Sequence, residues 1–350
     1  MAATPGRASL IALLLLCGVT LLYFHRQNSE VAAQRVTESP APIKAPNRAP
    51  EWCDTDVKVC SHRLKVDGLG DSARQSVVER MQVLAAQGVT CYDIDVVATR
   101  EGFMLVAHPQ ALQEMLLRHN VSGPVQALTL AELQAAVGGP ARLAQLAPLL
   151  TDLLREFSAL PGSRERGGGE EQEAPQLFVE LKGRAFSSSG LQYIAQQLDM
   201  LGISQTVSIW FPPGQPGDVE LLRRVREAHG LRLKAGRSYI DSLAGPLPGS
   251  PRTAVQSEVT EQDKFFDFLG PSLAAQPAQL FLDIQRSGLP MVLWVVDTQP
   301  GLEQALKVGA SCVISNKPLH IQALLKQMRR SNCSHGEAGF RHSTTKERHH

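Results

Sequence analysis

The sequence has no marked excess of charge of either sign. Its 35 lysine and arginine residues nearly balance 34 aspartate and glutamate residues, so the formal net charge is +1 at pH 7. This balance does not indicate a nucleic-acid-binding protein, which normally has a clear basic excess. Apart from residues 9–24, the sequence also lacks long runs dominated by aliphatic side chains. With 43% hydrophobic residues over 350 positions, the chain can still bury the core of a full-sized domain.

Residues 9–24 form an uncharged, mostly apolar run that is flanked by basic residues. The run is short for a plasma-membrane span and long for the core of a signal peptide, and the small residues 31–33 lie farther beyond it than cleavage sites usually do. We expect a signal anchor over residues 1–26, with a cleaved signal peptide as the alternative, and a proline-rich stem over residues 27–50. The following domain would then lie on the lumenal side of the endoplasmic reticulum or Golgi membrane, or be secreted.

Glycosylation sequons and cysteines agree with a lumenal location. The sequons are at Asn120 and Asn332, and both predict a glycoprotein. Beyond the apolar run there are five cysteines, so at least one stays unpaired unless a partner chain supplies a thiol. These are Cys53, Cys60, Cys91, Cys312 and Cys333. Cys53 and Cys60 are close enough in sequence to form a disulfide, whereas Cys91 and Cys312 lie in predicted strands, where we expect packed apolar side chains.

Short apolar runs bounded by turn residues predict eight strands, and amphipathic helical patterns lie between most of them. The predicted strands are residues 57–62, 91–97, 103–107, 177–182, 205–210, 231–235, 291–297 and 312–315. Strands and helices that alternate over about 270 residues are typical of a single (β/α)8 TIM-like barrel. We place the barrel at residues 51–330, with loop-like insertions at 161–175 and 244–251 and a disordered tail at 331–350.

Polar, charged and tryptophan side chains stand at the carboxyl ends of several predicted strands. They include His62, Asp95, His108, Lys182, Trp210 and Trp294. Active sites of (β/α)8 barrels lie at this rim, whereas charges at the opposite rim serve stability. The sequence therefore predicts an active site built from several strands.

The residue types in these positions suit the cleavage of a phosphodiester. In Asp93-Ile94-Asp95 the strand period of two places both carboxylates on one face, where they could bind a hard cation such as Mg²⁺ or Ca²⁺. Glu180 supplies a third carboxylate. It lies in a predicted strand whose other residues are mostly apolar, and a charge in such a buried strand is costly unless it is paired or binds an ion. The cation and a basic side chain would reduce the repulsion between the negatively charged phosphodiester and an approaching nucleophile. Two histidines would act as the base and as the acid that protonates the leaving alkoxide.

In their order along the chain, these segments resemble the glycerophosphodiester phosphodiesterases. The resemblance runs over residues 57–330 and rests on His-Arg, on an acidic pair, on a strand that ends in histidine, and on Glu-Leu-Lys. It continues through residues 129–133, 148–153, 294–297 (Trp-Val-Val-Asp, like Trp-Thr-Val-Asn) and 309–318 (ending Ser-Asn-Lys-Pro, like Thr-Asp-x-Pro). It implies a metal-dependent hydrolase that converts a glycerophosphodiester, or a phosphodiester of lysophospholipid type, to an alcohol and a glycerol phosphate.

Carried over to this sequence, the resemblance assigns a role to each candidate residue. His62 and His108 would be the acid and base pair, and Arg63 and Lys182 would face the substrate phosphate. Asp93, Asp95 and Glu180 would hold the divalent metal, Mg²⁺ or Ca²⁺, and Trp294 would line the substrate pocket.

The sequence also departs from the family pattern. Leu64 replaces the glycine after His-Arg, and Pro109 replaces the aspartate after the second histidine. The family's Glu-Asn-Thr is absent, with either residues 71–73 or residues 75–77 in its place, and Asp93 is shorter by one methylene than the family's glutamate. A second function is therefore a degenerate barrel that binds a phosphate or a lipid headgroup without turnover. The retention of three carboxylates and both histidines favours the enzyme.

Overall fold

The computed structural model describes residue 53 and residues 56–68, 75–163, 174–212, 217–229, 233–239, 259–274 and 276–333. All of them belong to one compact unit, Ala49–His350. The predicted anchor and stem, the loop at 244–251, most of the insertion at 161–175 and residues 334–350 lie outside the described residues. In the described part of the chain, no helix is both long and apolar enough to cross a bilayer.

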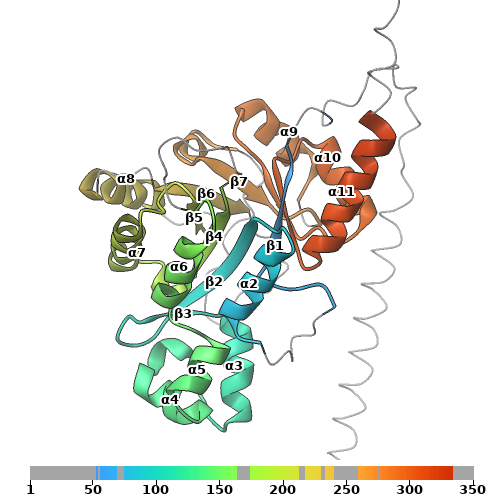
Figure 1. Ribbon diagram of the computed structural model, residues 1–350. Helices are drawn as coiled ribbons and strands as arrows, with labels where there is room; N and C mark the ends of the chain where they lie inside the picture. The colour runs from blue at the N-terminus through green and yellow to red at the C-terminus, as the bar shows by residue number, and fades with distance from the viewer. Residues whose placement is uncertain are drawn as a thin grey trace, which may run out of the picture. The chain divides into compact units, whose positions relative to one another are not determined.

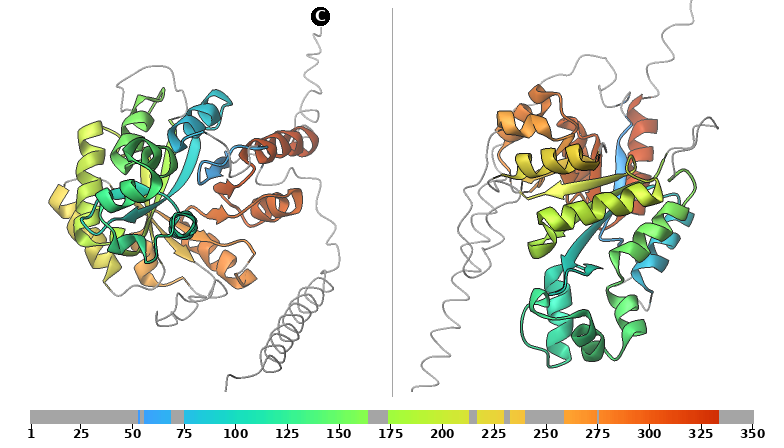
Figure 2. Two further views of the ribbon diagram at one scale, coloured as in Figure 1. Left: turned by 90° about the horizontal axis from the view of Figure 1, so that it is seen from below. Right: turned by 90° about the vertical axis from the view of Figure 1, so that its left-hand side faces the viewer.

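Eight parallel strands surround a common interior, with helices on the outside (Figure 1; Figure 2). They follow one another in chain order, β9 pairs with β1, and isolated bridges between the β7 and β8 regions complete the ring. The strands are β1 (Lys58–His62), β2 (Cys91–Ala98), β4 (Gln176–Lys182), β5 (Val207–Phe211), β6 (Lys234–Tyr239), β7 (Phe268–Pro271), β8 (Val292–Trp294) and β9 (Cys312–Ser315). The predicted (β/α)8 TIM-like barrel is confirmed.

The helices begin where the sequence supplies caps. Ser76 and Thr129 each form a capping box with a glutamate three residues later, which satisfies free N–H groups of the first turn. The helices are α2 (Val77–Ala86), α3 (Pro109–Arg118), α4 (Leu130–Val137), α5 (Pro140–Leu146), α6 (Leu150–Ala159), α7 (Ser188–Leu201), α8 (Asp218–His229), α9 (Ala278–Ser287), α10 (Gln299–Lys307) and α11 (Pro318–Cys333). Short 3-10 helices are η2 (Val125–Ala127), η3 (Gly183–Ala185) and η4 (Glu261–Phe265).

Two of the predicted strands require correction. Residues 103–107 do not form a barrel strand: Met104–Val106 is β3, a short strand that runs antiparallel to β2. The eighth barrel strand is instead β7, whose sequence Phe-Leu-Gly-Pro was not predicted as a strand because it is short and ends in two turn-forming residues. The predicted strand at 231–235 begins later, at Lys234.

The apolar side chains form three clusters. The largest lies between the strands and the surrounding helices, and a smaller one fills the barrel interior with Phe178, Trp210 and Phe268. A third cluster joins the β2–β3 hairpin to helices α3, α4 and α5, with Leu105 and Leu116 fully buried. These helices lie together at one end of the barrel in Figure 1, so the hairpin has its own small core beside the barrel.

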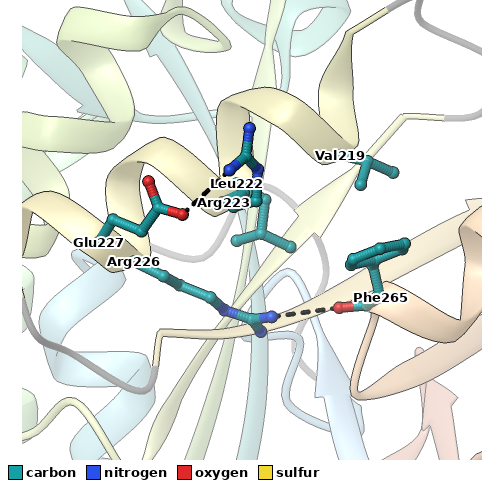
Figure 3. A pocket seen from close by; sticks show the side chains of 6 residues that line it. All are labelled: Val219, Leu222, Arg223, Arg226, Glu227 and Phe265. Carbon is teal, nitrogen blue, oxygen red and sulfur yellow. Dashed lines mark hydrogen bonds and ion pairs between the residues drawn. The ribbon is translucent and has the colours of Figure 1, made fainter.

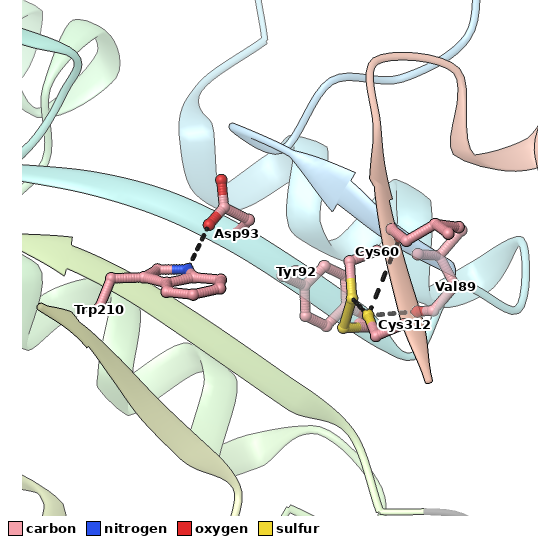
Figure 4. The surroundings of a disulfide bond; sticks show 8 residues. Cys60, Val89, Tyr92, Asp93, Trp210 and Cys312 are labelled. Carbon is pink, nitrogen blue, oxygen red and sulfur yellow. Dashed lines mark hydrogen bonds between the residues drawn. A yellow bond between two sulfur atoms is a disulfide. The ribbon is translucent and has the colours of Figure 1, made fainter. Parts of the chain in front are cut away.

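The cysteine pairing differs from the prediction. Cys53 is bonded to Cys333 and Cys60 to Cys91, so Cys53 and Cys60 do not pair and Cys91 is not a packed thiol. Cys60 and Cys91 lie on the neighbouring strands β1 and β2, and both side chains belong to the interior cluster (Figure 4). Residues on neighbouring strands can be close in space although they are far apart in the sequence. Among the cysteines that the structure describes, Cys312 is free and buried in β9, as predicted.

The tail predicted at residues 331–350 also begins too early. Helix α11 continues to Cys333, whose disulfide to Cys53 joins the last helix to the chain just before β1. Asn332 is therefore part of a helix and does not lie in an irregular tail.

Candidate active site

The β2–β3 hairpin brings His108 back to the barrel rim. Val106 pairs with Val96, and the next N–H, from Ala107, donates to the carbonyl of Asp95 at 3.0 Å. His108 follows at once and is the residue that precedes α3. Pro109 occupies the first turn of that helix, where its missing N–H costs nothing. Pro109 is thus compatible with the start of α3 directly after His108.

Four predicted site residues form a continuous chain of charges. Asp95 and Glu180 are register partners on β2 and β4. The carboxylate of Asp95 lies 2.8 Å from Arg63 Nε and 3.4 Å from Lys182 Nζ, and Lys182 also pairs with Glu180. The structure therefore brings together four residues, Arg63, Asp95, Glu180 and Lys182. From the sequence it was known only that they lie in or next to predicted strands.

Asp93 lies deeper in the interior, one strand period before Asp95. Its side chain is 6% exposed, and Trp210 Nε1 donates to Oδ1 at 3.2 Å (Figure 4). Burial, and then the charges of Asp95 and Glu180, raise the pKa of Asp93 well above its ordinary value. Burial also raises the pKa of Glu180, although Lys182 opposes the shift. Three carboxylates thus share a poorly solvated space.

The three carboxylates do not form a tight ligand set as they stand. Among the described residues, the only group of three or more potential metal ligands whose atoms all lie within 4.8 Å of one another is the sulfurs of Cys60, Cys91 and Cys312. Asp95 and Glu180 direct their oxygens at Arg63 and Lys182 instead. Their donor type suits a hard cation, and rotation of these side chains is needed for the oxygens to converge.

Both histidines are partly buried near the Arg63–Asp95 pair. Burial lowers the pKa of His62, while a hydrogen bond to Asn316 opposes the shift. Burial lowers the pKa of His108 to about 4, with an opposing effect of Asp95. Both rings are therefore neutral near pH 7, the form that can accept a proton.

Leu64 adopts a backbone conformation that favours glycine. Arg63 and Leu64 have φ angles of 54° and 53°, in the left-handed region, where a Cβ costs about 1–2 kcal/mol. The resembled pattern has glycine at the second of these positions. The Leu64 side chain is fully buried, and it contributes to the wall of the cavity beside Arg63.

A cavity of about 530 Å³ opens between the rim and helix α3. Arg63, Asp95 and His108 line it, together with apolar side chains of which Leu112 and Met115 come from α3. His62, Asp93, Glu180, Lys182 and Trp294 do not line it. The cavity has the mixed polar and apolar wall that suits a small organic phosphate or the headgroup end of a lipid.

Trp294 lies at the end of β8, with its indole N–H on the carbonyl of Gly270 at 2.9 Å. It is half-buried and packs against the aromatic interior instead of the cavity. The sequence did not identify Asn316 and Asp297 as parts of the site. Their place in two segments that carry the resemblance was the only signal in the sequence. The structure adds that Asn316 contacts His62 and that Asp297 contacts Asn316.

A second hollow lies elsewhere, between α8 and η4 (Figure 3). Its volume is about 260 Å³, and its charged residues are already paired with each other or with backbone carbonyls, as in Arg223 with Glu227 and Arg226 with Phe265. None of the predicted site residues lines it.

Comparison with known proteins identifies the fold of the chain. No protein-family model and no curated protein matches the chain. A glycerophosphodiester phosphodiesterase from Parabacteroides distasonis is 13% identical, with a TM-score of 0.55 over 78% of this chain and 98% of that one. A phosphodiesterase from Oleispira antarctica, in complex with sn-glycerol-3-phosphate, is 17% identical, with a TM-score of 0.53 over 77% and 96%. The chain therefore has the barrel fold of solved glycerophosphodiester phosphodiesterases.

Proposed function

We propose that this protein is a metal-dependent phosphoric diester hydrolase. Its substrate is a glycerophosphodiester or a phosphodiester of lysophospholipid type, and its products are an alcohol and a glycerol phosphate. The observation that carries the proposal is that His108 lines one cavity with the Arg63–Asp95 ion pair, while His62 directly precedes Arg63 at the end of β1. Two histidines beside one basic group suit proton transfer around a phosphate.

The charges of the site match those of the substrate. Arg63 and Lys182 carry N–H groups that can donate to phosphate oxygens, both pair with Asp95, and Arg63 also lines the cavity. One histidine would take the proton from the attacking O–H group. The other would give a proton to the leaving alkoxide as its bond to phosphorus breaks, so that protons balance over the reaction. The anionic substrate itself favours the protonated form of the acid.

The carboxylates support the metal part of the proposal. Asp93, Asp95 and Glu180 together carry three negative charges in their ionised forms, against two positive charges on Arg63 and Lys182. The raised pKa values of Asp93 and Glu180 reflect that deficit of positive charge as well as burial. These three residues would hold Mg²⁺ or Ca²⁺, and the bound ion would supply additional positive charge for the phosphate oxygens.

A single observation favours the competing function, a barrel that binds phosphate without turnover. Asp95 and Glu180 already form ion pairs with Arg63 and Lys182, so part of the negative charge is balanced without an ion, although Asp95 Oδ2 has no hydrogen-bond partner among the described residues. In that case the basic side chains would bind the anion, and no metal would be required.

One assay separates the two functions. The full-length protein is incubated with glycerophosphocholine, glycerophosphoethanolamine and lysophosphatidylcholine, and the released glycerol phosphate, alcohol and lysophosphatidate are measured with Mg²⁺, with Ca²⁺ and with a chelator. Hydrolysis that the chelator abolishes and added metal restores is the expected result. Binding of these compounds in calorimetry, with no product formed under any condition, would instead support the binding protein.

A further inference from the structure

Three residues behind His62 form a hydrogen-bonded row. His62 ends β1, Asn316 directly follows β9, and Asp297 lies three residues beyond β8, so the row crosses the ends of three adjacent strands. His62 Nδ1 lies 2.8 Å from Asn316 Oδ1, and Asn316 Nδ2 donates to Asp297 Oδ2 at 2.7 Å. Each contact has the length of a good hydrogen bond.

The Asp297 carboxylate is held firmly. Its Oδ1 accepts from the backbone N–H of Asn316 at 2.7 Å and from the hydroxyl of Ser315 at 2.9 Å. Burial works to raise the pKa of Asp297, but the hydrogen bonds from Asn316 and Ser315 outweigh it and hold the pKa below its ordinary value. The group is therefore an ionised acceptor with a fixed orientation.

The carboxylate determines which way the Asn316 amide points. An ionised carboxylate can only accept hydrogen bonds, so the NH₂ group of Asn316 must face Asp297. The amide oxygen of Asn316 then faces His62, and because that oxygen can only accept, Nδ1 of His62 must carry the hydrogen. This holds for the neutral and for the protonated ring. Nε2 is consequently the one ring nitrogen that can exchange a proton with another molecule.

We propose that Asn316, oriented by Asp297, is a positioning residue that fixes the ring of His62 and reserves Nε2 for proton transfer with the reacting oxygen. The proposal rests on the proposed function and specifies how one of its two histidines operates. During the reaction a single proton passes between the substrate oxygen and Nε2, while the bond from Nδ1–H to Asn316 stays in place. Neither Asn316 nor Asp297 touches the substrate.

The sequence offers an independent reason to treat the two residues as a unit. In the resembled pattern the first position is asparagine and the second is aspartate, whereas here Asp297 and Asn316 occupy them in the opposite order. One carboxylate and one amide are present in both arrangements. An exchange of the two side chains should thus give another row in which every donor meets an acceptor, while a change of Asn316 alone to aspartate sets two carboxylates 2.7 Å apart.

The first experiment reads the ring directly. The full-length protein is labelled with ¹⁵N-histidine, and the His62 signals are assigned by their loss in His62→Gln. In the wild-type protein the neutral ring should show Nδ1 protonated and Nε2 unprotonated, and Asn316→Leu should produce a mixture of tautomers. A wild-type spectrum with Nδ1 unprotonated overturns the proposal. This readout does not need turnover, so it decides the proposal even if the protein hydrolyses none of the tested phosphodiesters.

The second experiment uses kinetics on the phosphodiester that the wild-type protein cleaves. Asn316→Leu should lower kcat by about 10-fold to 100-fold with little change in KM, the usual range for a residue that orients a functional group. The double variant Asp297→Asn/Asn316→Asp should recover activity relative to Asn316→Asp alone. Gln299→Leu, the same kind of change at an exposed position of α10, is the control. Wild-type kcat in Asn316→Leu, or a double variant no better than Asn316→Asp, would contradict the proposal.

Discussion

Gly270 lies directly against the indole of Trp210. A Cβ at position 270 would come 2.3 Å from two ring carbons of Trp210, closer than carbon atoms can approach. Trp210 in turn donates to Asp93 at 3.2 Å, and the carbonyl of Gly270 accepts from Trp294. The glycine in β7 therefore determines where two tryptophans lie in the interior and, through one of them, how Asp93 is held.

Gly270→Ala should force Trp210 away from its position and destabilise the barrel. Overpacking of a filled core costs about 1–3 kcal/mol, and the loss of the Trp210 bond to Asp93 adds to it. Denaturant unfolding of both proteins, followed by tryptophan fluorescence, measures the difference. Gly301→Ala is the matched control, because its Cβ would come no closer than 3.3 Å to any neighbouring atom, with Thr298 Oγ1 the nearest, and alanine favours the helix α10. Equal stability of the two variants would show that the interior can absorb the extra methyl group.

The sequence predicted the barrel as a whole better than it predicted its individual strands. Periodicity correctly predicted the barrel, because apolar alternation and helical spacing directly reflect burial. It failed at β7, where Gly270 and Pro271 resemble a turn, and at residues 103–107, where a hairpin strand has the same apolar pattern as a barrel strand. Periodicity contains no information about whether a strand continues the barrel or folds back on its neighbour.

For the site, the sequence predicted which residues lie near the ends of strands but not which of them contact one another. His62, Asp95 and Lys182 were expected at one rim because they fall near the ends of predicted strands. In the structure His62 and Lys182 end β1 and β4, whereas Asp95 lies within β2, three residues before its end, and pairs with Lys182. Asn316 could not be singled out, since its importance depends on a contact with His62 across 254 positions of the chain. The pairing of Cys60 with Cys91 was missed for the same reason, because side chains on neighbouring strands meet regardless of their spacing in sequence.

His108→Ala should lower kcat by about a hundredfold or more, as is usual for a positioned proton-transfer group, and His62→Ala should do the same. Binding of a phosphodiester should survive, because Arg63 and Lys182 remain. His119→Ala is the control, since His119 lies exposed just after the same helix α3. Steady-state kinetics of the full-length variants gives the comparison. A His108→Ala rate near that of the wild type would remove this residue from the mechanism.

Asp93→Asn and Glu180→Gln should each weaken the binding of Mg²⁺ or Ca²⁺ to the protein. Each change keeps the size of the side chain and removes one negative charge from a hard-cation site. Activity should be partly restored when the metal concentration is raised. Calorimetric titration of each metal into the full-length protein tests this, with Asp199→Asn at an exposed position of α7 as the control. If the wild-type protein binds neither ion, the metal part of the proposed function is wrong.

Removal of the interior disulfide should destabilise the fold. Cys60→Ala/Cys91→Ala opens a link between β1 and β2 with a sequence separation of 31, and loss of such a bond costs about 2–5 kcal/mol. Cys312→Ala removes a buried thiol without opening any bond and should cost less. Thermal unfolding compares the variants, and peptide mapping without reduction should recover Cys53 linked to Cys333. Recovery of a Cys53–Cys60 peptide pair would contradict the structure.

Asn120 should carry an N-glycan if the predicted lumenal location is correct. Its side chain is exposed beyond the end of α3, where an oligosaccharide has room and disturbs no packed contact. Protein expressed in mammalian cells should lose apparent mass on treatment with an N-glycosidase, and Asn120→Gln should reduce that loss. Asn332→Gln provides the comparison, because Asn332 and Cys333 of that sequon lie in the last turn of α11 and Cys333 is bonded to Cys53. In sealed microsomes the barrel should also resist added protease. A barrel that is digested there and has no glycan would locate the domain in the cytosol, and the predicted anchor topology would then be wrong.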